Sequence, residues 1–119
     1  MRALVKVAGM VIMAAALSTA ASAAQWKGVL IDKHCEAGLA KSGMKAVQAH
    51  SRSCALMPGC AKSGYGVYTS SGKFIPFDAA GNQKALAALK ASTKKDNLQV
   101  VVNGTQRKGA IHVSSLKLM

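Results

Sequence analysis

The stretch "LQVVVNGTQRKGAIHVSSLKL", Leu98 to Leu118, has the alternation that decides the fold class. Its first arm places apolar side chains at every second position, and the second arm returns after the polar turn "TQRKG" with the same period of two. This period is typical of β-strands with one buried face. The apolar phase shifts by one position after Val113, so we expect a β-bulge at Ser114 and Ser115.

Three further elements are predicted upstream of these two strands. "QWKGVLID" (residues 25–32) alternates and predicts a first strand, while "YGVYT" and "KFIPF" flank the short polar "SSG" and predict a hairpin. Pro76 cannot donate to a strand ladder, so the second arm of this hairpin should lie at an edge. "QKALAALKAST" (residues 83–93) consists of good helix formers and predicts a short helix with Asn82 as its N-cap.

The order of these elements predicts an α+β fold. Five strands, with one helix between the third and the fourth, match a small OB-like barrel, which is a five-stranded and partly open Greek-key barrel. A Cys-containing helical insertion would then follow the first strand. Another small α+β sandwich is the alternative, because the match rests on the order and length of the elements.

The first 23 residues have the three parts of a secretory signal peptide. Arg2 and Lys6 give a basic start, Val7–Leu17 is an uncharged apolar run, and small residues lead to a cleavage point near Ala23. The apolar run is shorter than the about 20 residues that span a membrane as a helix. We therefore expect a single small OB-like domain, residues 24–119, that is periplasmic or secreted and keeps no transmembrane anchor once the signal is removed.

The mature domain is strongly basic. Sixteen Lys and Arg, less the two in the signal peptide, face four acids, which leaves a net charge of +10. Nucleic acid is a poor candidate partner, because export takes the chain away from it and the few aromatic residues give no stacking surface. The charge predicts a well-solvated surface, with anionic envelope polymer, lipid or an envelope protein as the partner that such a surface would attract.

The segment "SGMKAVQAHSRSCALMPGC" predicts a helix that ends where Pro58 disfavours helix at the residue before it. Four side chains recur at spacings of three, four and three and share one helix face: Val47, His50, Cys54 and Met57. His50 and Cys54 should therefore lie one turn apart, with Cys60 just beyond the helix. The same stripe is also typical of the buried side of a core helix, in which His50 only bonds to backbone.

The three cysteines allow two uses in an exported protein. A disulfide would staple the small domain, and any one of the three pairings leaves one sulfur over. Alternatively the sulfurs bind zinc or copper, since three thiolates and an imidazole suit tetrahedral zinc and thiolates with a thioether suit Cu(I). The candidate metal ligands are Cys35, His50, Cys54 and Cys60, with His34 as an alternative to His50 and Met57 as a further donor. A purely structural role without any cofactor stays open.

An enzyme is not indicated by the pattern. Cys54 near a helix C-terminus would have its thiolate opposed by the helix dipole, and no third group to orient His50 is evident. The four acids are isolated from one another along the chain: Asp32, Glu36, Asp78 and Asp96. No pair of carboxylates suggests general acid and base work.

The segments "GVLIDKHC", "HSRSCALMPGCAKSGYGVYT", "GKFIPFDAAGNQKALAALK" and "IHVSSLKL" resemble a group of small exported bacterial proteins of uncharacterised function. The similarity covers nearly the whole mature chain. It implies an exported, barrel-like domain in a bacterial envelope, and it implies no established activity, cofactor or catalytic residue. The group pattern has a His, Cys, Cys constellation that follows an earlier Asp and Cys, which here would be His50, Cys54, Cys60, Asp32 and Cys35.

We therefore expect a non-enzymatic binding or envelope-associated module, whose Cys/His cluster is either a disulfide staple or a soft-metal site. A basic adhesion domain for anionic envelope polymer or lipid, with purely structural cysteines, is the alternative.

Overall fold

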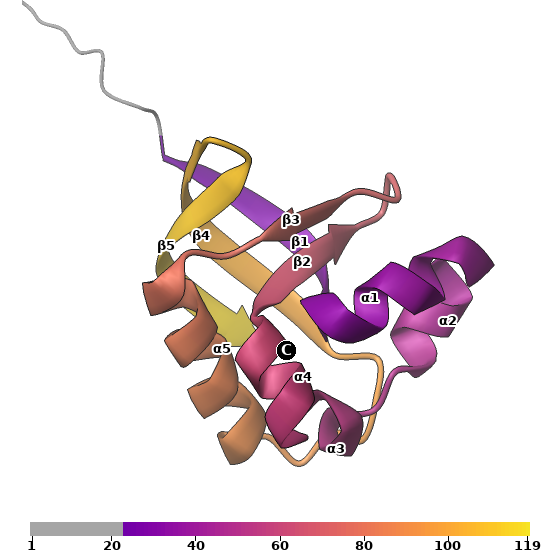
Figure 1. Ribbon diagram of the computed structural model, residues 1–119. Helices are drawn as coiled ribbons and strands as arrows, with labels where there is room; N and C mark the ends of the chain where they lie inside the picture. Colours follow the sequence, from indigo (N-terminus) through magenta and orange to yellow (C-terminus); the bar gives the residue numbers. More distant parts are fainter. Residues whose placement is uncertain (1–22) are drawn as a thin grey trace, which may run out of the picture.

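The computed structural model describes residues 23–119 and has an α+β fold around a five-stranded antiparallel sheet (Figure 1). The predicted signal peptide, residues 1–23, lies outside the described residues except for Ala23. None of the helices in the described part is long and apolar enough to cross a membrane. The strands are β1 (Ala24–Asp32), β2 (Tyr65–Thr69), β3 (Phe74–Pro76), β4 (Gln99–Arg107) and β5 (Ala110–Leu118).

The sheet has the order β3-β2-β1-β4-β5, so β1 is its central strand and the predicted first hairpin, β2 and β3, is confirmed. Pro76 is the last residue of edge strand β3, where the missing N–H leaves no gap in the ladder. The described strands form an open sheet and not a closed barrel. One isolated parallel bridge, between Phe77 and Ile111, joins the segment after β3 to β5.

The predicted bulge lies in β5. Asn103 pairs with Ser115, but the next residue, Gly104, pairs with Val113, so Ser114 has no opposite partner on β4. The extra residue explains why the apolar phase of the sequence changes at this point, because it moves the following side chains to the other face of the strand.

The predicted continuous helix up to Met57 is wrong, because the segment between β1 and β2 forms several short helices. The backbone is extended at His50 and again at Met57, so each of these residues separates two helices. Pro58 begins a helix rather than following one, since its fixed φ suits the first helical position. These helices are α1 (Lys33–Leu39), η1 (Ala40–Ser42), α2 (Met44–Ala49), α3 (Arg52–Ala55) and α4 (Pro58–Ser63).

The predicted helix between the third and fourth strands is present as α5 (Ala79–Ala91), but it begins earlier than expected. Its N-cap is Asp78, whose carboxylate accepts a hydrogen bond of 2.9 Å from the Gly81 amide. Asn82, the predicted N-cap, instead lies inside α5 and accepts a hydrogen bond of 2.8 Å from the amide of Tyr65. Asn82 thereby links the helix to the start of β2.

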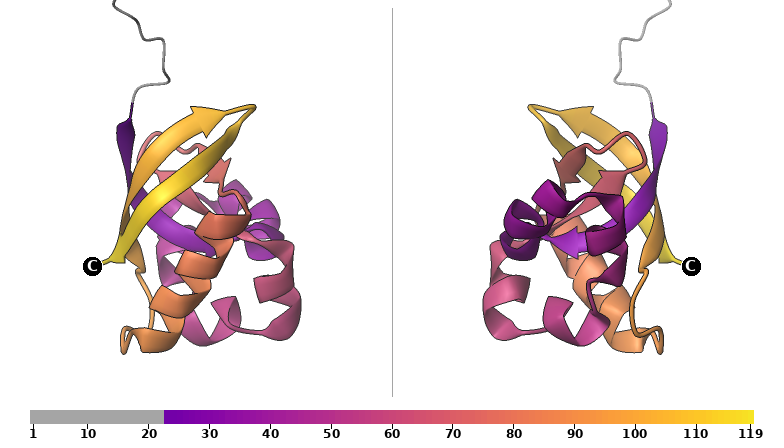
Figure 2. Two further views of the ribbon diagram at one scale, coloured as in Figure 1. Left: turned by 90° about the vertical axis from the view of Figure 1, so that its left-hand side faces the viewer. Right: turned by 90° about the vertical axis from the view of Figure 1, so that its right-hand side faces the viewer.

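Both faces of β1 are covered, so its apolar residues serve two clusters. Leu30 belongs to the main core under α5, whereas Val29 and Ile31 pack with Val47 and Tyr68 beside α1 and α2. The opposite views in Figure 2 show α5 on one side of the sheet and α1 with α2 on the other. This double burial fixes the end of β1, from which the chain enters the cysteine-containing segment.

We expect Gly81→Ala to lower the free energy of unfolding by about 1–3 kcal/mol, the usual effect of overpacking a filled core. A Cβ at Gly81 would lie 2.5 Å from Val113 Cγ2 and 2.7 Å from Phe77 Cβ, which leaves no room between α5 and β5. Gly38→Ala is the control, because nothing lies within 4 Å of its Cβ position. Urea unfolding measures both variants, and equal midpoints would contradict the close packing of α5 on the sheet.

Candidate metal centre

Cys35 is positioned by the end of the central strand. Asp32 is both the last residue of β1 and the N-cap of α1, and its Oδ2 accepts a hydrogen bond of 2.9 Å from the amide of Cys35. A second bond, of 2.8 Å from the Lys33 amide to the Gly64 carbonyl, ties the start of α1 to the end of α4. The first turn of α1 is thus held on both sides.

Cys54 and Cys60 come from two short helices, α3 and α4. Ser51 caps α3 by accepting a hydrogen bond of 3.1 Å from the amide of Cys54. Ser63 donates a bond of 2.7 Å to the carbonyl of Cys60 at the end of α4. These local bonds place the two cysteines opposite α1, which packs against α4 (Figure 1).

The three cysteines form one cluster, which we call the thiol triad (Cys35, Cys54 and Cys60). The Sγ atom of Cys35 lies 3.8 Å from that of Cys54 and 3.9 Å from that of Cys60, and all three sulfurs lie within 4.8 Å of one another. A disulfide has an S–S distance of about 2.05 Å, so none of the pairs is bonded. The three cysteines lie together as sequence analysis predicts, but His50 is not part of this group, and the disulfide, one of the two uses left open, is not formed in this structure.

The sulfur separations fit a metal ion. Zinc binds thiolates at about 2.3 Å in a tetrahedron, whose corners are then about 3.8 Å apart. The two distances from Cys35 match this edge length. Cys60 is buried and the other two are partly buried, so the triad surrounds a position at the boundary between core and solvent. Three thiolates in this arrangement are suited to a soft cation.

His50 belongs to a second group that shares Cys35. Its Nε2 lies 3.2 Å from Oδ1 of Asp32, and both side chains are almost completely buried. A ligand atom from each of Asp32, Cys35 and His50 lies within 4.8 Å of the others. Asp32 Oδ1 and both ring nitrogens of His50 have no hydrogen bond in this arrangement, although buried polar atoms normally do.

The surroundings of Cys35 favour the ionised form of the Asp32 carboxyl group and the protonated forms of the Cys35 and Cys60 thiols. Burial alone would raise the pKa of Asp32, but His50 and the Cys35 amide outweigh it and lower that pKa below its ordinary value. Burial raises the pKa of the Cys35 thiol, and the Asp32 carboxylate raises it further. Burial also raises the pKa of Cys60. The Cys35 and Cys60 thiols are therefore poor thiolate nucleophiles on their own, and a cation would have to displace their protons.

A pocket of about 360 Å³ opens beside the triad. Its lining contains the buried Cys60 together with two donors that sequence analysis proposes as alternative ligands, His34 and Met57. The fourth lining residue is Gly59. His34 follows the N-terminus of α1 and Met57 precedes α4, so the pocket lies where these helices face each other. We call it the α1–α4 pocket.

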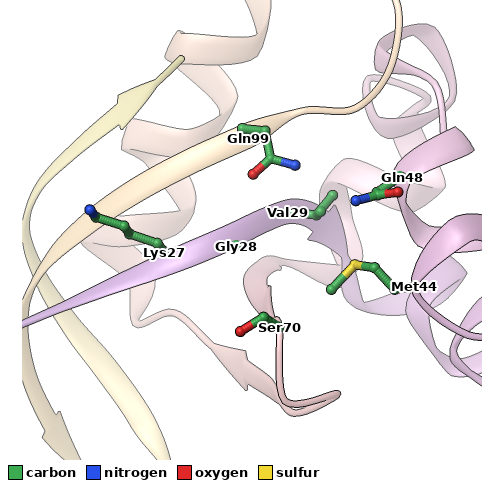
Figure 3. Close-up of a pocket in the computed structure, with 7 residues that line it drawn as sticks. All are labelled: Lys27, Gly28, Val29, Met44, Gln48, Ser70 and Gln99. Carbon is green, nitrogen blue, oxygen red and sulfur yellow. The ribbon is translucent and has the colours of Figure 1, made fainter.

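A second concavity, of about 290 Å³, lies between α2, the β2–β3 turn and strands β1 and β4 (Figure 3). Gln48, Gln99 and Met44 surround its centre, and Lys27 lies towards its outer end. Its lining has amide and ammonium groups but neither a carboxylate nor a thiol. Met44 is thus the one soft donor among the residues that line this cleft, which has no thiolate to accompany it.

Asp32 is the residue that sequence analysis undervalues, since it is treated there as one of four isolated acids and joins the cysteines only through the family resemblance. The available signal was its spacing: an Asp directly after an alternating strand and three residues before Cys35 is typical of a helix N-cap. His112, by contrast, is an exposed residue of β5 whose Nδ1 lies 3.5 Å from Oδ2 of Asp78, and it belongs to neither of the two groups that contain Cys35.

No protein-family description matches this sequence, and comparisons with curated proteins and with solved structures find no match. The case for the site therefore rests on the geometry of the chain itself.

The free energy of unfolding should fall at alkaline pH because Tyr65 ionises. We expect this part of the fall to be missing in the Tyr65→Phe variant. The Tyr65 hydroxyl donates a hydrogen bond of 2.7 Å to the Ala55 carbonyl at the end of α3. Burial, with Asp32 and Cys60 adding to it, raises the pKa of Tyr65 to about 12. The unfolded chain ionises near pH 10, so the stability from neutral Tyr65 is present below about pH 10 and is lost as the pH rises towards 12.

Urea unfolding at pH 7, 9, 10 and 11 measures this effect. At pH 7 the variant should be less stable by about 1 kcal/mol, the usual contribution of one buried hydrogen bond, and the difference should shrink above pH 10. Tyr68→Phe is the control, because Tyr68 packs in the other apolar cluster, beside α1 and α2. A constant difference across this pH range would show that Tyr65 ionises freely.

Proposed function

We propose that this protein is an exported, non-enzymatic module that binds one soft metal ion, zinc or Cu(I), through the thiol triad. The observation that carries the proposal is the separation of the sulfurs, 3.8 Å and 3.9 Å from Cys35, which is the spacing of thiolates around a shared ion. The ion supplies the positive charge that lets three thiols lose their protons next to a buried carboxylate.

A metal ion accounts for the arrangement better than a disulfide does. A disulfide would use two sulfurs and leave the third as an unused thiol, and Cys35 lies equally close to both candidate partners. The buried carboxylate of Asp32 also favours a nearby cation, because buried charges are normally paired or bound to metals. These two observations support a site that uses all three sulfurs at once.

The surrounding residues have separable tasks in such a site. Asp32 orients the first turn of α1 through the Cys35 amide, and it lies against the imidazole of His50. A carboxylate next to a histidine is a common support for a metal site, where it fixes the orientation of the ring. His50 would then support the Cys35 side of the site, because it groups with Asp32 and Cys35 and not with Cys54 and Cys60.

The proposed setting is the periplasm or the outside of a bacterial cell. The pattern of residues 1–23 supports export, and the charge of the mature domain supports contact with an anionic envelope. An OB-like ancestry of the sheet belongs to the same proposal, and the bridge between Phe77 and Ile111 supports it because it joins the two edges that a barrel would close. An oxidising compartment makes metal loading compete with disulfide formation.

We expect the reduced protein to bind one ion of zinc or Cu(I) per chain, measured by elemental analysis after anaerobic loading and desalting. Changing any one of the three cysteines to serine should weaken binding by more than the 10–100-fold typical of a residue that only supports a ligand. Ser53→Ala is the control, since Ser53 is exposed and adjacent to Cys54.

The intact mass of the exported protein, measured without reductant and after thiol alkylation, can contradict this proposal. A loss of two hydrogens together with one alkylatable thiol and no bound metal would sink the three-thiolate site. That result would instead support a structural disulfide.

A second candidate is a surface for anionic envelope polymer, favoured by one shallow basic pocket. Ser51, Arg52, Ser53, Lys94 and Lys95 line this pocket of about 360 Å³. The Arg52 guanidinium donates to the carbonyls of Leu89 and Lys94, so it joins α3 to the end of α5 and fixes the two lysines beside it. The ammonium groups of Lys94 and Lys95 would attract the anionic polymer.

For this second candidate, we expect Lys94→Gln with Lys95→Gln to weaken binding to an anionic polysaccharide by about fivefold per lysine, the value of one cation near an anionic surface. Lys41→Gln with Lys45→Gln removes the same charge elsewhere and should have less effect. Affinity chromatography over a salt gradient measures both. Equal losses for the two pairs would show that only net charge matters and that the pocket has no special role.

A further inference from the structure

The α1–α4 pocket joins the thiol triad to solvent. Cys60 is only 6% exposed, yet it lines this pocket together with His34 and Met57. Nothing lies within 4 Å of the Cβ position of Gly59, so the mouth of the pocket is not blocked on that side. A molecule of a few atoms can therefore approach Cys60 from solvent without any movement of the sheet.

Met57 is in an unusual position for an apolar side chain. It is 55% exposed, and within residues 23–119 only Met119 is a comparably exposed large apolar residue. Its backbone is extended because Pro58 follows it, and this conformation directs the chain away from the core between α3 and α4. The sequence thus keeps a thioether at the surface, in the pocket that Cys60 lines, rather than in the core.

His34 provides a second donor on the opposite wall. It is exposed in the first turn of α1, and its amide donates a hydrogen bond of 3.1 Å to Ser63 Oγ at the end of α4. That bond holds the two walls of the pocket together. The affinity of these groups for a soft metal ion thus increases from the surface inwards, from the imidazole of His34 and the thioether of Met57 to the thiolate of Cys60.

We propose that the ion of the triad is Cu(I) and that it enters and leaves through the α1–α4 pocket by exchange with an incoming sulfur donor, with Met57 and His34 as the transfer residues. The inference rests on the proposed function, because it needs the triad to bind an ion. Three thiolates suit Cu(I), and an added thioether favours Cu(I) over zinc. The triad and the pocket together then describe a module that passes copper on rather than one that stores it.

The exchange step is a ligand substitution without a change of oxidation state. The incoming Cu(I)–sulfur bond of the donor breaks as the bond from Cu(I) to Cys60 Sγ forms. The proton of the Cys60 thiol passes to water or to the departing thiolate of the donor. Met57 holds the ion transiently at the mouth, so that it is never released free into solution.

The donor class is a soft sulfur ligand. The basic surface of the domain, with a net charge of +10 after removal of the predicted signal peptide, favours an anionic donor such as a Cu(I)–thiolate complex. A small thiol and a methionine-rich protein segment are both soft sulfur donors, the first through an anionic thiolate and the second through a neutral thioether. Two probes distinguish these sources: a Cu(I)–glutathione complex and a Cu(I) complex of a methionine-rich peptide.

Stopped-flow transfer of Cu(I) from each probe to the reduced protein tests the inference. We expect Met57→Leu to slow transfer about tenfold, which corresponds to about 1.4 kcal/mol in the transition state, and His34→Gln to slow it less. The equilibrium affinity for Cu(I), measured by competition with a chromophoric chelator, should stay within about threefold of the original. Met44→Leu is the matched control, because Met44 lies in the separate cleft beside α2.

Each outcome decides between the two proposals. If the original protein binds zinc but no Cu(I), the inference fails and the proposed function stands. If it binds neither ion, both fail. Tight binding together with an unchanged transfer rate in Met57→Leu would overturn the transfer role alone. An equal fall of rate and affinity in that variant would make Met57 a permanent ligand, which also overturns it. Faster transfer from glutathione than from the peptide identifies the small thiol as the donor.

Discussion

The hydrogen bond from the Cys35 amide to Asp32 Oδ2 is the contact on which the site depends. It lies at the end of β1, the central strand, which is paired on both sides and contributes residues to both apolar clusters, so the strand cannot shift without disrupting the two clusters. The carboxylate turns the chain into α1, fixes the first cysteine and faces His50. The sheet thereby fixes the position of the first turn of α1, at the start of a segment that consists only of short helices.

The helices around the triad are too short to be stable alone. α3 has four residues, α4 has six and α1 has seven, whereas isolated helices shorter than about 12–15 residues are marginal in water. Caps from Asp32 and Ser51, and the bond between Arg52 and Lys95 backbones at 2.7 Å, hold them in place. Because the sulfurs sit on such elements, binding of an ion and folding of this segment should stabilise each other.

The strands were predictable because their signal is local. The period of two in β4 and β5, and even the bulge at Ser114, can be read from the apolar positions alone. The helix through His50 and Cys54 was predicted wrongly because a spacing of three and four does not reveal extended residues between short helices. The prediction that the three cysteines lie close together is confirmed. The pairing of Asp32 with His50, by contrast, depends on a contact between distant segments, which sequence periodicity cannot reveal.

The bond between the Lys33 amide and the Gly64 carbonyl has a consequence for how such a protein can change over time. It closes residues 33–64 into an excursion that leaves the sheet and returns to it at the same place, because Asp32 and Tyr65 are paired neighbours in β1 and β2. All three sulfurs lie inside this excursion, and the main core lies largely outside it. Residues 33–64 therefore form a self-contained insertion between two paired strands. Its metal-binding side chains can be exchanged, or the whole insertion moved to another pair of strands, without a change in the sheet that supports it.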